Sequence, residues 1–147
     1  MATSKILCFI LIAILNSTVV LSQKTEDVNR VEFNSGTRTY REQIIITPDS
    51  LSVIKEDFRV DERPQIIRRS TTLQEWKSVT DAIKNIRLTE IETLQSPTMK
   101  RTFDAAAHGS IIITIPDGRS FTHGFDDENP HKKFRALMDE IRKFRKD

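Results

Sequence analysis

Residues 110–118 have the sequence Ser110-Ile111-Ile112-Ile113-Thr114-Ile115-Pro116-Asp117-Gly118, and this stretch decides the fold. Isoleucine occupies both alternating faces of the segment, which is typical of a central strand that is covered on both sides. The Pro-Asp-Gly that follows is a hairpin turn signal, and 119–123 returns as the second strand. This pairing places His123 opposite about Ile112. The stretch therefore predicts an antiparallel hairpin whose first strand is buried.

Period-two alternation of apolar and polar residues predicts more strands upstream. The clearest is 39–47, where one face is apolar towards its end and the other carries mostly polar side chains. Turn chemistry at 48–50 joins it to a second alternating run at 51–56, so we expect a hairpin there. A shorter alternation lies at 31–33, and 65–69 is a further candidate strand.

Two segments change to helical spacing. Thr72 and Glu75 have the spacing of a capping box, and apolar residues recur through 73–86, which predicts a helix over about 72–85. Near the C-terminal end, Asn129 and Pro130 offer an N-cap and a first-turn proline for a helix over about 130–146. Its apolar stripe consists of Phe134, Leu137, Met138, Ile141 and Phe144. The stretch 88–97 is compatible with either an irregular turn or a short helix.

These elements predict one α+β domain over 30–147. Their order is a β-rich half, a helix, a β-hairpin and a C-terminal helix. Hairpin connections give antiparallel pairing, so we expect a four- to six-stranded antiparallel sheet with two helices packed on one face. Residues 23–29 are mostly polar, and we expect them to form a flexible leader before the domain.

The chain opens with Lys5, followed by ten consecutive apolar residues at 6–15. A helix of that length rises about 15 Å, which is about half the hydrocarbon thickness of a bilayer. With the small residue before Gln23, the pattern predicts a secretory signal peptide over 1–22, and an uncleaved membrane anchor is the alternative. Cleavage would remove Cys8, the single cysteine. We therefore expect an exported protein, periplasmic or secreted, with a cysteine-free mature domain and no transmembrane segment after cleavage.

The charge balance bears on the choice of partner. The full chain has a net charge of +2, and loss of Lys5 with the signal segment lowers it to +1. This near-neutral balance argues against nucleic acid as a partner, because such binding needs a clear surplus of Lys and Arg. The last helix is rich in Lys and Arg, which fits either a face for an acidic or anionic partner or an ordinary solvated surface. An envelope protein or a glycan is the expected partner.

The best candidate binding segment is the loop 100–109, which contains Arg101, Asp104 and His108. Its alanines and glycine allow close backbone approach, and Asp104 is able to accept hydrogen bonds from Arg101 or from loop amides. The alternative is a structural loop in which Asp104 caps a turn. We add His123 and Asp126 to the candidate binding residues, because both lie just downstream in the returning strand and the loop that follows it.

Catalytic and metal-binding motifs are weak. No nucleophile elbow or glycine-rich phosphate loop is present, so we name no catalytic residue and expect no cofactor. The histidines lack the close spacing of a zinc site, and we expect no metal, although His123 with Asp126 and His131 stays possible. The remaining enzymatic alternative is a small secreted hydrolase that uses His108, His123 and nearby acids.

Three features together resemble small exported proteins of unknown function found in bacterial envelopes. They are the N-terminal signal, the hairpin over 40–53 with Thr47-Pro48-Asp49-Ser50 at its turn, and the loop 101–106 followed by the isoleucine strand and Asp117-Gly118. The resemblance implies localisation and fold class only, and it carries over no catalytic residue. We therefore expect an exported, non-enzymatic binding or structural module of the cell envelope.

Overall fold

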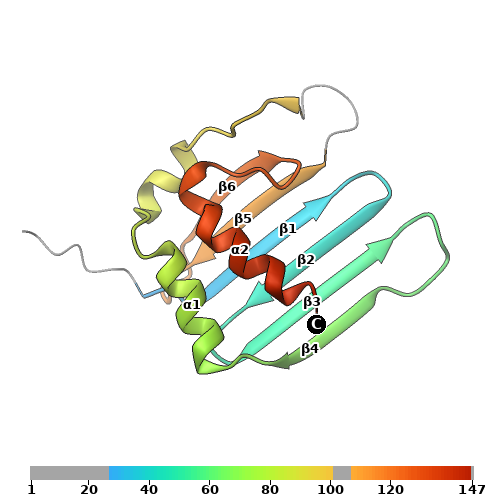
Figure 1. The fold of residues 1–147 in the computed structure, drawn as a ribbon, viewed down its shortest axis with the longest axis horizontal. Helices are drawn as coiled ribbons and strands as arrows, with labels where there is room; N and C mark the ends of the chain where they lie inside the picture. Colours follow the sequence, from blue (N-terminus) through green and yellow to red (C-terminus); the bar gives the residue numbers. More distant parts are fainter. Residues whose placement is uncertain (1–26, 101–106, 147) are drawn as a thin grey trace, which may run out of the picture.

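The computed structural model describes residues 27–100 and 107–146. The expected signal peptide, most of the leader, and the candidates Arg101 and Asp104 lie outside these ranges. The described residues form an α+β domain (Figure 1). Its elements, in chain order, are β1 (Arg30–Gly36), β2 (Tyr40–Ile46), β3 (Ser50–Asp57), β4 (Gln65–Ser70), α1 (Leu73–Ile83), the 3₁₀ helix η1 (Leu88–Thr93), β5 (His108–Thr114), β6 (Ser120–Asp126), the 3₁₀ helix η3 (Lys132–Phe134) and α2 (Arg135–Phe144).

All six strands belong to one antiparallel sheet with the order β4-β3-β2-β1-β5-β6. The first four strands form a meander, and the β5–β6 hairpin then adds to the free side of β1. The expected turn at Pro116-Asp117-Gly118 is present, with Gly118 at a φ of 88°. The antiparallel sheet predicted from the sequence is confirmed, at the upper end of the expected strand number.

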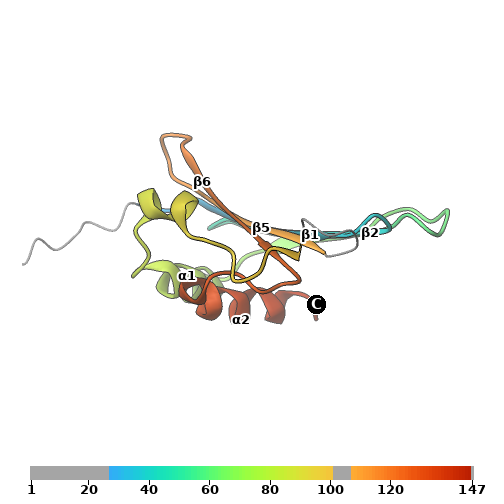
Figure 2. The same cartoon turned by 90° about the horizontal axis from the view of Figure 1, so that it is seen from above.

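Both helices lie on the same face of the sheet, as the edge-on view in Figure 2 shows, and α1 and α2 contact each other. Because the side chains of a strand alternate between the two faces of the sheet, every second residue of a strand points towards the helices. The strands contribute the buried side chains of Val31, Phe33, Ile44, Ile46, Leu51, Val53, Ile111, Ile113 and Phe125. The helices contribute Val79, Ile83, Leu137, Met138, Ile141 and Phe144. The hydrophobic core is therefore a single layer between one sheet face and two helices.

The start of α1 follows the predicted capping box. Thr72 accepts a hydrogen bond from the Glu75 amide at 3.2 Å, and the Glu75 carboxylate accepts one from the Thr72 amide at 2.8 Å. The prediction that Leu73 joins the buried stripe is wrong, because its side chain is 85% exposed. The first turn of α1 lies beyond the edge of the core, so only Val79 and Ile83 of this helix are fully buried.

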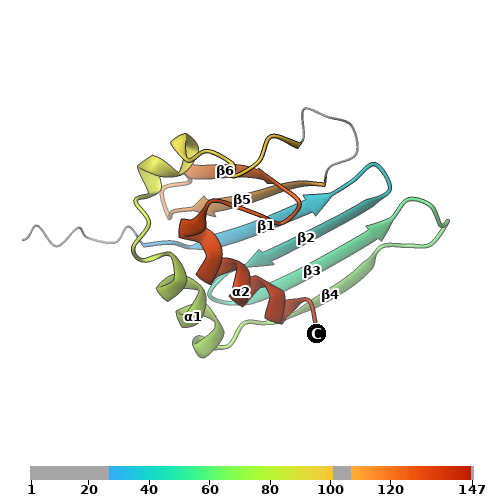
Figure 3. The ribbon, with the colours of Figure 1, turned by 45° about the horizontal axis from the view of Figure 1, so that its top comes forward.

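The start of the last helix differs from the prediction. Asn129 does not cap it, because its amide bonds to the Asp126 carbonyl in the preceding turn. Instead the His131 side chain accepts from the Lys133 amide at 3.3 Å and begins the 3₁₀ turn η3, which continues into α2. The 3₁₀ helix η1, which follows α1 in the chain, lies along the outer edge of β6 (Figure 3).

The strand 110–115 is not covered on both sides. Ile111 and Ile113 of β5 are fully buried under the helices, but Ile112 points to the opposite face and is only half-buried. In the described ranges no helix or strand lies over that face (Figure 2). None of the helices described is both long enough and apolar enough to span a bilayer.

Candidate functional site

The sheet face that the helices leave uncovered forms an ordered surface, which we call the open face. Its cross-strand pairs join into rows that run across the sheet. One row consists of Arg68, Ser52, Ile45, Glu32, Ile112 and Thr122. The next consists of Ile66, Ile54, Gln43, Asn34, Ser110 and Gly124. A third, the end row, consists of Glu56, Arg41, Gly36, His108 and Asp126.

A hydrogen-bonded group of side chains occupies the centre of the open face. Gln43 donates to Glu32 Oε1 at 2.9 Å and to Asn34 Oδ1 at 3.1 Å. The Asn34 amide donates to Glu32 at 3.1 Å and to Ser110 Oγ at 3.3 Å, and Arg30 pairs with the other oxygen of Glu32. We call these five residues the Glu32 network. Because each polar group has a partner within the surface, the network fixes the positions of its side chains.

The electrostatics of this network favour a charged Glu32. Partial burial pushes the pKa of Glu32 up, but the hydrogen bonds from Asn34, Arg30 and Gln43, together with the positive charge of Arg30, outweigh burial. The pKa of Glu32 is therefore below its ordinary value of 4.5. The centre of the open face keeps a carboxylate at neutral pH that already accepts hydrogen bonds from three neighbouring side chains.

Four isoleucines surround the Glu32 network on the open face. Ile45 and Ile112 pair directly with Glu32 from either side, and Ile54 of β3 pairs with Ile66 of the edge strand β4. Ile66 is 50% exposed. The open face therefore combines apolar side chains with a fixed polar centre, which is the composition of many protein interaction surfaces.

The end row contains two of the residues singled out in the sequence. His108 is exposed and pairs across the strands with Asp126, which is fully buried. Asp126 accepts a hydrogen bond from the Thr98 hydroxyl at 2.8 Å. Asp126 therefore anchors the segment that follows η1, while His108 remains available at the surface.

His123 lies on the opposite side of the sheet from His108. Its ring is buried between those of Phe125 and Phe134, with centroid distances of 5.8 and 5.0 Å, and its Nε2 accepts from the His131 amide at 3.0 Å. His123 pairs with Ile111, one residue from the predicted partner. This partner, Ile111, lies three residues from His108 along β5, which is about 10 Å. The two imidazoles therefore do not meet in one site.

The sequence left one possible metal-binding set, His123 with Asp126 and His131. In the ranges 27–100 and 107–146, no three His, Cys, Asp or Glu side chains lie close enough together to hold an ion. In the possible set around the last loop, His123 uses Nε2 for the His131 amide, and His131 uses Nδ1 for the Lys133 amide. Both rings therefore have a structural role at the start of η3.

A buried ion cluster joins β2 to the end of α2, and sequence reasoning missed it. Arg145 Nη2 lies 2.5 Å from Glu42 and 2.7 Å from Glu128, and its guanidinium stacks 5.0 Å above the Phe33 ring. Burial lowers the pKa of Arg145, but the hydrogen bond to Glu128 and the negative charges of Glu42 and Glu128 outweigh this and raise the pKa above its ordinary value. Glu42 alternates with Ile44 and Ile46, so an acid on an apolar strand face was the available signal.

The turn after β6 has an unusual backbone. Asp127 and Glu128 both have positive φ, at 51° and 60°, which is uncommon for residues other than glycine. Their contacts hold the turn in place, since Glu128 pairs with Arg145 while Asp127 pairs with Lys100 and accepts from the Ala107 amide. This turn therefore connects the end row of the open face with the last helix.

A groove lies beside this turn, between the segment 93–97 and α2. Its volume is about 980 Å³. We call it the helix groove and define it by its lining residues, Thr93, Leu94, Gln95, Ser96, Pro97, Glu128, Asn129, Pro130, His131, Lys132, Arg135, Met138, Asp139 and Arg142. His108, His123 and Asp126, the candidate binding residues that the structure describes, do not line it.

Fold and surfaces together define a class: a one-sheet, two-helix α+β protein with an uncovered sheet face and a groove beside its last helix. The sequence matches no protein-family model. A search of curated proteins likewise finds no match.

Proposed function

We propose that this protein is an exported, non-enzymatic binding module that holds a protein of the cell envelope on its open face. The observation that carries the proposal is the open face itself, on which four isoleucines surround the prearranged Glu32 network. A surface whose polar side chains are already fixed loses little conformational freedom when a partner covers it. We prefer a protein to a glycan, because aliphatic side chains flanking a satisfied polar centre suit the mixed composition of a protein surface.

The size of the open face is adequate for this role. Six strands about 4.8 Å apart and about seven residues long span roughly 24 by 20 Å. A partner covering this area would bury about 500 Å² on each side, or about 1,000 Å² in total. That value lies at the lower limit for a specific interface and suits a transient complex.

The proposed location outside the cytoplasm is supported by the charged and apolar N-terminal residues. We expect material from the native host to begin at Gln23 and to lack Cys8. Mass analysis of the purified protein measures this directly, and retention of Met1 would contradict export by cleavage.

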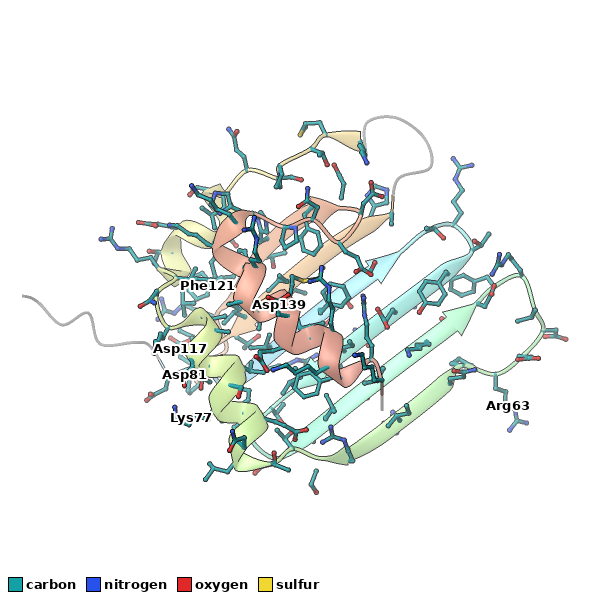
Figure 4. The ribbon with its side chains drawn as sticks, in the orientation of Figure 1. Arg63, Lys77, Asp81, Asp117, Phe121 and Asp139 are labelled. Carbon is teal, nitrogen blue, oxygen red and sulfur yellow. The ribbon has the colours of Figure 1, made fainter. Side chains whose placement is uncertain are left out.

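The proposed binding surface is tested by photo-crosslinking in the native host. A crosslinking residue in place of Thr122 lies on the open face beside Ile112. The same residue in place of Lys77 lies on the outer side of α1 (Figure 4) and serves as the matched control. We expect a discrete covalent adduct from position 122 and none from position 77. Adducts from position 77 alone would contradict the proposal.

A second variant identifies the residues responsible. Adding Ile45→Lys to the chain with the crosslinker at position 122 places a charge in the same row of the open face, and we expect it to abolish the adduct. Leu73→Lys makes the same chemical change on the exposed start of α1 and should leave the adduct intact. Equal loss in both variants would show that the effect is not confined to the open face.

We further propose that the segment containing Arg101 and Asp104, which precedes His108 in the sequence, takes part in partner binding. Alanine at both positions should weaken partner capture while leaving the melting temperature unchanged. A matching fall in melting temperature would assign this loop a structural role instead.

A further inference from the structure

The helix groove has two walls of different character. One wall is the extended segment 94–97, and the other is the side of η3 and α2 that carries Lys132, Arg135 and Arg142. Apolar side chains from both walls line the space between them, since Leu94, Pro130 and Met138 are all part of the lining. Pro130 and Met138 are almost fully buried, so the groove offers a small apolar strip formed mainly by Leu94 and bordered by a row of cations.

The charges of the groove do not cancel. Its two acids are already paired, because Glu128 lies 2.7 Å from Arg145 and Asp139 lies 2.9 Å from Arg142. Asp139 is on the outer side of α2 (Figure 4). Among the residues that the structure describes, Lys132 and Arg135 have no ion-pair partner. The groove therefore presents two uncompensated positive charges, three residues apart on one helical side.

The wall opposite these cations also has unused hydrogen-bonding capacity. Ser96 lines the groove, and its buried hydroxyl has no hydrogen-bond partner in the described part of the chain. A buried hydroxyl without a partner is unfavourable, and because this one has almost no exposed surface, a bound polar group satisfies it only if the Ser96 side chain turns towards the groove. This observation is independent of the charges on α2.

The dimensions of the groove favour an extended ligand. From Lys132 to Arg142 the helix rises about 15 Å. An extended peptide covers this distance with about five residues, and its alternate side chains point to the same side. Acidic side chains at alternate positions would then face the cations, while apolar side chains between them would contact the strip.

We propose that the helix groove binds a short, extended, acidic segment of a partner protein, with Lys132 and Arg135 pairing its carboxylates. The groove faces away from the open face, so this site is separate from the one proposed above and does not depend on it. Arg135 suits the role because its planar guanidinium binds a carboxylate through two parallel hydrogen bonds.

The test uses the full chain and a fluorescently labelled peptide that alternates glutamate with leucine. Binding is measured by fluorescence anisotropy, with a peptide of the same length that replaces glutamate by glutamine. We expect saturable binding of the acidic peptide with a dissociation constant below about 1 mM, weaker binding at higher salt, and no saturation with the glutamine peptide.

Variants locate the site. The double substitution Lys132→Gln with Arg135→Gln should weaken binding about tenfold or more, because it removes two charged partners. The control Lys143→Gln with Lys146→Gln changes the net charge of the same helix equally, but neither residue lines the groove. We expect the control to bind within about twofold of the unchanged protein. Both variants are compared by melting temperature to verify that they fold.

Three results would overturn the proposal. Absence of saturable binding to the unchanged protein excludes an acidic-peptide site. Equal weakening in the groove variant and in the control shows that binding follows net charge rather than the groove. If inorganic phosphate displaces the peptide at equal concentration, the cations recognise a small anion and the apolar strip takes no part.

Discussion

Gly109 of β5 and Phe125 of β6 lie directly opposite each other, and the Phe125 ring occupies the space beside the glycine. A Cβ on Gly109 would lie 2.3 Å from Cε2 of Phe125, so no larger residue fits without movement of the ring. Phe125 also lies 6.3 Å from Phe33, which links this pair to the core. The close backbone approach that small residues suggested before the isoleucine strand is therefore present at Gly109.

The first prediction concerns this contact. Gly109→Ala should lower the free energy of unfolding by about 1–3 kcal/mol, because an added methyl overpacks a filled region. Ser110→Ala is the matched control on the next position, where the side chain points to the open face and makes one weak bond to Asn34. We expect it to change stability by less than about 1 kcal/mol. Urea unfolding measures both, and equal effects would contradict the described packing.

The second prediction concerns the buried ion cluster. Arg145→Met should lower the free energy of unfolding by about 3 kcal/mol, because it leaves the charge of Glu42, which is 3% exposed, without its partner. Adding Glu42→Gln to this variant should recover part of the loss, since the unpaired charge is then removed. Arg142→Met, which breaks an exposed pair with Asp139, should have an effect below about 1 kcal/mol. Chemical denaturation of the four proteins distinguishes these outcomes.

The third prediction concerns acid stability. Hydrogen bonds from Arg69 and from the Thr72 amide hold the pKa of Glu75 at about 2, below its ordinary 4.5. A carboxyl group with a lowered folded-state pKa stabilises the fold fully above its unfolded pKa, and this stabilisation is lost as the pH falls towards the folded value. The stability difference between the unchanged protein and Glu75→Gln should therefore be constant above pH 4.5 and shrink between pH 4.5 and about 2.

Thermal melts over a series of pH values measure this difference. Glu92→Gln serves as the control, because Glu92 is an exposed acid on η1 and has no ion-pair partner among residues 27–100 and 107–146. Its melting curve should follow that of the unchanged protein at every pH. A Glu75→Gln difference that persists unchanged down to pH 2 would show that the Arg69 contact contributes nothing through charge.

The fourth prediction tests which sheet face is covered. Ile112 and Ile113 are neighbours in β5, but Ile113 is fully buried under the helices and Ile112 lies on the open face. Ile113→Lys should therefore unfold the domain, because it buries an unpaired charge. Ile112→Lys should reduce stability by about 1 kcal/mol or less. Circular dichroism and urea unfolding compare the two, and a reversed order would mean that the register is shifted by one residue.

Much of the fold followed from patterns that depend on neighbouring residues. Alternation gave the faces of β2 and β3, and the Thr72 capping box gave the start of α1. The register of the β5–β6 hairpin was predicted to within one residue, since a tight turn fixes the pairing. Features that depend on distant elements were missed. The exposure of Leu73 follows from where α1 passes the edge of the core, and this position depends on packing rather than on helical period.

The candidate sites show the same division. His123 alternates with Phe121 and Phe125, and that apolar alternation was the signal that it is a core residue. The Glu32 network was not predicted, because its members come from three strands and meet only through the order β2-β1-β5. The Arg145 cluster joins residues about a hundred positions apart, so spacing in the sequence carries no sign of it.

The place of β1 in the sheet also determines when the domain becomes able to fold. This strand pairs with β2 immediately, but its other side stays vacant until β5 has been synthesised, and Asn34 bonds to a residue 76 positions later. The apolar side of the early meander is fully covered only after α2, the last element in chain order, joins α1 on it. The apolar face of the meander is therefore exposed on the nascent chain through most of its synthesis. We expect holdase chaperones to bind this meander while the ribosome is still translating.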